Sequence, residues 1–213
     1  MPEPSGIFDP GFLLALEVSI KIHHIIYPAV PPQGIYFEEL VEQSFVRIKR
    51  PFTHIKGTGA TMAGPDLLVE DKRISLKTET GSGTKPDLIT ITKLCTTERD
   101  PWDVPTLVGR VLEHLSRYDL ILMLRCVLEL PLIHYQLLEI PVKNVRLIET
   151  AQFALVGPPR SGGRRQSLKA VVRREDQELF DAFFDASDGK CTIRKLRVAD
   201  CVMLDRWDIK AGG

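Results

Sequence analysis

The 213-residue sequence lacks the features that mark membrane-spanning and exported proteins. Its longest apolar run, residues 120–124, is far too short for a transmembrane helix, which takes about 20 residues. The first residues, Met-Pro-Glu-Pro-Ser, do not combine a basic start with an apolar segment, as a signal peptide does. We therefore expect a soluble, cytoplasmic protein.

Cysteine is scarce, and neither sign of charge is in excess. The four cysteines form no Cys-x-x-Cys pair, which argues against a zinc site or a disulfide framework and favours free thiols. Lys and Arg total 28, as do Asp and Glu, so the net charge does not indicate a polyanionic partner. Nucleic-acid binding would have to depend on where the basic residues lie. The length suits one domain with a full core.

Apolar periodicity and turn residues predict an α/β (α+β) fold, with a mixed central β-sheet flanked by helices. Helices are expected at residues 12–26, 35–48, 104–118 and 175–186. Strands are expected at residues 66–70, 74–80, 88–94, 119–124, 134–141, 191–198 and 201–204. The strand at 119–124 is apolar on both faces, so it belongs at the centre of a sheet that is covered on both sides.

The candidate chemistry lies in residues 64–81. If the two strands of this stretch form a hairpin closed by Asp71 and Lys72, Asp66 lies opposite Lys77. Directly opposed residues have Cβ atoms about 5 Å apart, so a carboxylate and an ammonium group would meet there. A β-bulge would change this register, and an ordinary surface hairpin with a cross-strand salt bridge would show the same spacing.

Side chains alternate between the two faces of a strand, so Ser75 and Glu79 are expected on the same face as Asp66 and Lys77. Phosphodiester hydrolysis needs such a group of residues. Carboxylate oxygens hold a hard cation, which neutralises charge on the phosphate and acidifies a bound water. A lysine beside the cation can orient the attacking water and stabilise the transition state.

This stretch resembles the PD-(D/E)XK nuclease superfamily, and within it most closely the type II restriction endonucleases. Pro65-Asp66 matches the Pro-Asp that opens one strand, and Ser75-Leu76-Lys77 matches the acidic-x-Lys triplet on the next. The resemblance implies that Asp66 is the central Mg²⁺ ligand, that a backbone carbonyl near Leu76 assists it, and that Lys77 is the catalytic lysine. Ser75 departs from the pattern. Some restriction enzymes resemble this sequence in having Ser-x-Lys, with a carboxylate from elsewhere.

Three glutamates are candidates for that carboxylate. Glu79 ranks first because it shares the predicted face, and Glu70 is a weaker choice. The same families usually carry a glutamate on the helix before the hairpin. Glu38 ranks second because it lies closer to the apolar flank of that helix than Glu39 or Glu42. Each of these three helix residues is otherwise an ordinary solvated side chain.

The densest basic cluster lies on and after the Gly-rich loop at residues 157–163. In a nuclease it could grip phosphates or reach guanine edges, and otherwise it is a flexible solvated loop. Its members are Arg160, Arg164, Arg165, Lys169, Arg173 and Arg174.

The resemblance implies a prokaryotic, homodimeric type II restriction endonuclease that cuts double-stranded DNA at a short palindromic site. Two-fold symmetry would match two active sites to the two strands, and the helix at residues 12–26 could serve dimerisation. We expect one nuclease domain over residues 1–213, with a βββαβ core at about 34–141 and recognition elements in 142–213. The alternatives are a structure-specific repair nuclease or junction resolvase, and a non-catalytic DNA-binding or protein-interaction module that keeps the fold.

Overall fold

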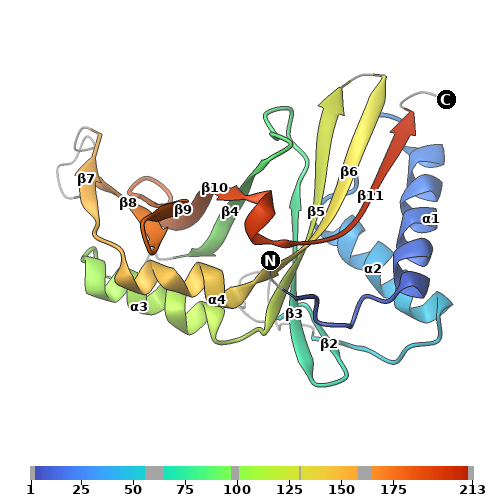
Figure 1. Cartoon of the computed structure of the whole chain (residues 1–213), viewed down its shortest axis with the longest axis horizontal. Helices are drawn as coiled ribbons and strands as arrows, with labels where there is room; N and C mark the ends of the chain where they lie inside the picture. The colour runs from blue at the N-terminus through green and yellow to red at the C-terminus, as the bar shows by residue number, and fades with distance from the viewer. Residues whose placement is uncertain (1–2, 56–64, 97–100, 130, 158–164, 211–213) are drawn as a thin grey trace.

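The computed structural model describes residues 3–55, 65–96, 101–129, 131–157 and 165–210 (Figure 1). Within these ranges the chain forms a mixed α+β fold with two β-sheets. The helices are α1 (Pro10–Ile26), α2 (Ile35–Arg47), α3 (Val104–Leu115) and the short α4 (Val142–Val145), with 3₁₀ turns at Arg146–Thr150 and Val198–Asp200. The strands are β1 (Thr53–His54), β2 (Leu67–Val69), β3 (Lys72–Glu79), β4 (Leu88–Thr96), β5 (Leu120–Glu129), β6 (Leu132–Pro141), β7 (Ala154–Val156), β8 (Ser167–Arg174), β9 (Gln177–Asp185), β10 (Lys190–Arg197) and β11 (Val202–Lys210).

The first sheet has the strand order β1-β2-β3-β5-β6-β11. Its strand β5 pairs in parallel with β3 and antiparallel with β6. Ile121 and Met123 on β5 pack into the core formed with α3, whereas Leu122 and Leu124 pack into the core formed with α1 and α2. The prediction of a central strand covered on both faces is therefore confirmed.

Two helices, α1 and α3, begin at a capping aspartate. The Asp9 carboxylate accepts a hydrogen bond from the backbone N–H of Phe12 (2.9 Å) at the start of α1, and Pro10 follows it. Asp103 caps α3 in the same way through Thr106 (2.9 Å). These aspartates fix the first turn of each helix. No helix of the described ranges is long and apolar enough to cross a membrane.

The second sheet has the strand order β4-β10-β9-β8-β7, and α3 and α4 lie on one side of it (Figure 1). The predicted helix at residues 175–186 is wrong, because this segment is a hairpin turn followed by β9. Phe180, Ala182 and Phe184 pack into the core with α3, whereas Asp181 contacts Lys169 and Lys195, as expected when side chains alternate between the two faces of a strand. The turn before them contains Glu175 at a φ of 56°, a left-handed conformation that a helix does not allow.

Each of the two sheets contains strands from both the predicted core, residues 34–141, and the predicted recognition region, residues 142–213. The order β2, β3, β4, α3 and β5 along the chain follows the expected βββαβ pattern, but β4 pairs with β10 of the second sheet. Conversely, β11 returns from the C-terminal region and pairs with β6 of the first sheet. The two sheets are thus joined by strands from both predicted parts.

Candidate active site

The β2–β3 hairpin turns one residue earlier than predicted, at Glu70 and Asp71. The paired residues are Leu67 with Ile74, Leu68 with Arg73 and Val69 with Lys72. Continuing this register places Asp66 opposite Ser75, so the prediction that Asp66 faces Lys77 is wrong. Glu70 adopts a φ of 56°, which permits the early turn without a glycine. Moving the turn by one residue changes each cross-strand partner by two residues. Every side chain therefore keeps its predicted face.

Two groups of β3 orient the carboxylate of Asp66. Its Oδ2 accepts a hydrogen bond from the backbone N–H of Leu76 (2.5 Å) and another from the hydroxyl of Ser75 (3.3 Å). Ser75 is buried, so its hydroxyl is fixed beneath the carboxylate. Both of these hydrogen bonds are made to Oδ2.

Lys77 and Glu38 complete a group around Asp66. The ammonium group of Lys77 donates to the backbone carbonyl of Leu76 (3.1 Å), the carbonyl proposed from the sequence as a metal ligand. Glu38 lies in the first turn of α2, which the buried side chain of Phe37 anchors against the sheet. Burial raises the pKa of Glu38, and the negative charge of Asp66 raises it further, whereas Lys77 lowers it. Glu38 therefore lies within electrostatic range of both Asp66 and Lys77.

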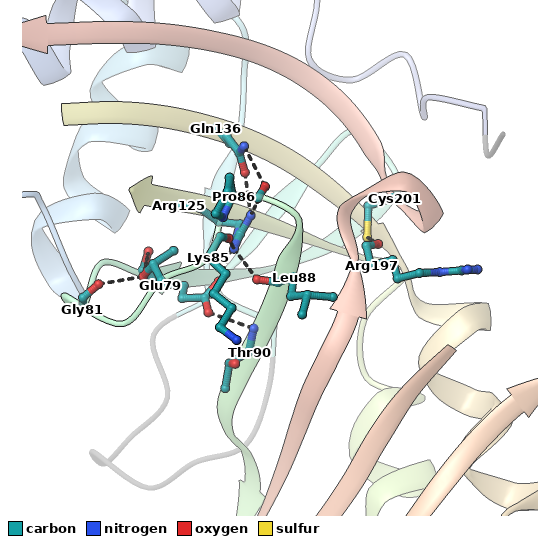
Figure 2. Close-up of polar contacts among 11 residues, drawn as sticks. Glu79, Gly81, Lys85, Pro86, Leu88, Thr90, Arg125, Gln136, Arg197 and Cys201 are labelled. Carbon is teal, nitrogen blue, oxygen red and sulfur yellow. Dashed lines mark hydrogen bonds and ion pairs between the residues drawn. The ribbon is translucent and has the colours of Figure 1, made fainter. Parts of the chain in front are cut away.

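Glu79, the first-ranked substitute for the missing acid, does not join this group. Its Oε2 accepts from Nε of Arg125 (2.7 Å), and its Oε1 accepts from the backbone N–H of Thr90 (2.9 Å) (Figure 2). Arg125 is fully buried, so it requires a counter-ion, and Glu79 supplies it. Glu70 is also remote: it is exposed in the hairpin turn and pairs with Arg50 (2.5 Å). Of the three candidates, Glu38 is the one whose pKa the charge of Asp66 raises.

Arg125 uses its remaining donors on main-chain and side-chain oxygens. Nη2 donates to the carbonyls of Lys85 (2.6 Å) and Leu88 (2.5 Å), and Nη1 donates to Gln136 (2.5 Å) and, more weakly, to the carbonyl of Pro86 (3.5 Å). Figure 2 shows the connection from β3 to β4 wrapped around this guanidinium group. The network fixes the point at which the chain leaves the first sheet.

Four further residues lie near the site, and of these only Glu42 was considered from the sequence, as an alternative to Glu38. Burial lowers the pKa of His114 to about 4, and the positive charge of Lys77 adds to the effect, so this histidine is neutral at pH 7. The hydroxyl of Tyr118 is buried without a hydrogen-bond partner among the described residues, and both its burial and the charge of Asp66 raise its pKa. On the α2 side, His54 contacts Glu42. All four come from segments outside the motif, so its spacing gives no signal for them.

The predicted DNA-binding cluster is only partly described. Arg160 and Arg164 lie outside the described residues. The others are engaged with neighbours: Lys169 with Asp181 (3.0 Å), Arg173 with Glu178 (2.8 Å), Arg174 with Asp200 (2.7 Å), and Arg165 over the ring of Trp102 (5.3 Å). Their role in DNA binding stays a prediction.

Comparison with known proteins gives one relative to report. The chain is 27% identical over 154 residues to the type II restriction enzyme SmaI of Serratia marcescens, an alignment that covers 70% of this chain and 60% of that enzyme. The chain therefore spans about 60% of the length of the curated relative it matches. No family model and no solved structure matches this sequence.

Replacing Arg125 by Met should lower the free energy of unfolding by about 3 kcal/mol, measured by urea unfolding, because it leaves the largely buried carboxylate of Glu79, 12% exposed, without its counter-ion. Arg125→Met combined with Glu79→Gln removes both charges and should recover part of this loss. If Glu79→Gln alone left stability unchanged and abolished DNA cleavage, Glu79 would be a metal ligand and not the partner of Arg125.

Glu38→Gln should stabilise the protein at pH 7. The raised pKa means that the folded state disfavours the charged form of Glu38. The protonated form therefore contributes stability that is fully present below the ordinary pKa of 4.5. This stability is lost as the pH rises through the raised pKa of the folded state. Urea unfolding at pH 7 should show a gain over the native protein that disappears at pH values below 4.5. Glu39→Gln, on the exposed side of the same turn, is the matched control. A loss of stability at pH 7 would contradict this account of Glu38.

Proposed function

We propose that this protein is a restriction-type endonuclease that hydrolyses phosphodiester bonds of double-stranded DNA in the presence of Mg²⁺. The observation that carries the proposal is the convergence of Asp66, Lys77 and Glu38 around the hairpin that resembles the PD-(D/E)XK motif. The similarity to a type II restriction enzyme supports the same reaction class. It also favours a restriction enzyme over a repair nuclease or a junction resolvase.

The donor atoms of the site suit Mg²⁺, which prefers oxygen ligands. Asp66 and Glu38 offer carboxylates, and Leu76 offers a backbone carbonyl. Among the described residues no three His, Cys, Asp or Glu side chains form a metal-binding group, so water and phosphate oxygens would supply the other ligands. The mutual repulsion of Asp66 and Glu38 is a feature that a hydrated cation would relieve. When bound, Mg²⁺ would neutralise phosphate charge and acidify a water.

The protein's own groups have distinct roles in this proposal. Ser75 and the backbone N–H of Leu76 hold the carboxylate of Asp66 in one orientation. The ammonium group of Lys77, beside the carbonyl of Leu76, orients the attacking water and stabilises charge that develops on the phosphate. Because burial keeps His114 neutral, Lys77 provides the positive charge on this side.

We also propose that two copies of the chain act together, so that each cuts one strand of a short palindromic site. The exposed side of α1 supports this arrangement, because its apolar residues recur every three or four positions and form a stripe. The stripe consists of Leu14, Val18, Ile22, Ile25 and Ile26, of which Ile25 is 79% exposed.

Asp66→Asn and Lys77→Ala should each reduce cleavage of duplex DNA by at least about 10²-fold, because each removes a group that acts on the reacting phosphate or water. The measurement is the rate of plasmid cleavage with Mg²⁺, with DNA binding followed in parallel. Lys72→Ala, at the exposed start of the same strand, is the matched control and should cleave normally. Full activity in either variant would contradict the catalytic role proposed for that residue.

Introducing negative charges into the α1 stripe should dissociate the proposed dimer. Ile22→Glu together with Ile25→Glu is expected to convert a dimer into a monomer in sedimentation velocity, because it buries carboxylates in an apolar contact. Leu155→Glu, at a similarly exposed position on β7, should leave the dimer intact. A native protein that sediments as a monomer at every concentration would contradict the dimer.

A further inference from the structure

The face of the second sheet that points away from α3 and α4 carries no α-helix of the described ranges (Figure 1). We propose that this open face is a docking surface for the phosphate backbone of duplex DNA, with Lys93, Lys169, Arg194 and Lys195 as the contact residues. The choice of DNA as the ligand rests on the proposed function. The surface itself is identified by an arrangement of bulges and charges.

The same four-residue pattern occurs on two neighbouring strands of this sheet. It is Ile-Thr-Lys-Leu at residues 91–94 of β4 and Ile-Arg-Lys-Leu at residues 193–196 of β10. In both, the isoleucine and leucine are buried and the two residues between them are exposed. The register of the two strands shifts on either side of the Ile91–Ile193 pair, which marks bulges. A bulge places two consecutive side chains on one face, here the open one.

Each bulge also holds a lysine in the left-handed region of backbone conformation. Lys93 has a φ of 55° and Lys195 a φ of 60°. A residue with a side chain is strained in this region, and glycine would fit without strain. Strained residues of this kind cluster at functional sites, where the side chain is needed despite the backbone. Two exposed lysines kept at such positions on adjacent strands therefore point to a use for their charge.

The lysines belong to a longer row of cations across the sheet. Lys169 on β8 and Lys195 on β10 both contact Asp181 on β9, at 3.0 and 3.1 Å. Burial disfavours the charge of Asp181, but the hydrogen bonds from the two lysines prevail and hold the pKa of this carboxyl below its ordinary value. The buried carboxylate thus holds two ammonium groups in place. Arg194 lies over the ring of Phe183 at 4.1 Å.

The dimensions and charge of the row suit a polyanion. From β8 to β4 it crosses four strands, or about 14 Å at the usual strand spacing, which is too long for one small anion. Two of the four cations share the carboxylate of Asp181, in a protein that has no net charge overall. Strand β4 is tied to the first sheet, because the backbone N–H of Thr90 on β4 donates to Glu79 on β3. A phosphate backbone has the charge and the length to match the row.

Glycine substitutions separate the charge of these lysines from their structural role. Lys93→Gly and Lys195→Gly remove a cation and relieve the positive φ, so the melting temperature should stay equal or rise. Binding to a duplex oligonucleotide without divalent ions should weaken several-fold for each. The slope of log affinity against log salt concentration should fall by about one per lysine and by about two in the double variant.

Lys49→Gly is the matched control, because Lys49 is an exposed lysine with a φ of 56° at the end of α2. It should stabilise the protein and leave DNA binding unchanged. The docking surface is overturned if the native protein binds no duplex at low salt, if the Lys93 and Lys195 variants bind as the native protein does, or if Lys49→Gly weakens binding equally. If the native protein cleaves DNA and these variants bind normally, the docking proposal fails alone. If it binds through these lysines without cleaving, the nuclease proposal fails alone.

Discussion

The buried guanidinium group of Arg125 is the interaction on which the arrangement of this molecule depends. It joins the end of β3 through Glu79, the neighbouring strand β6 through Gln136, and the connection to β4 through main-chain carbonyls. A fully buried cation with these partners allows few alternative conformations, because any loss of a partner leaves a charge unsatisfied. It therefore fixes where the chain leaves the first sheet and begins the second.

This constraint also decides the composition of the candidate site. Glu79 is used as the counter-ion of Arg125, so the second carboxylate comes from the helix α2, through Glu38. Ser75, at the position where the motif has an acid, donates a hydrogen bond to Asp66. The site is thus assembled from one helix and one hairpin, and the hairpin alone is incomplete.

Local signals predicted much of the fold, and contacts between distant segments account for the errors. Apolar periodicity and turn residues located α1, α2, α3 and the central strand β5, because those signals lie within or beside each element. The hairpin register was wrong by two residues because Glu70 turns the chain without a glycine signal. The segment at 175–186 was predicted as a helix, and it is a strand that packs against α3 and the neighbouring strands. Those contacts join segments far apart in the chain, so the local sequence does not reveal them. The pairing of Arg125 with Glu79 is likewise invisible in the sequence.

The central claim is that Asp66, Glu38 and Lys77 form a Mg²⁺-dependent site for cutting DNA. The most direct test is to incubate the purified native chain with plasmid and phage DNA, with Mg²⁺ or with a chelator, and to map the ends of the products. The account predicts discrete fragments with a common end sequence that appear with Mg²⁺ and are absent with the chelator. Intact DNA under both conditions, or equal cleavage in the chelator, would contradict it.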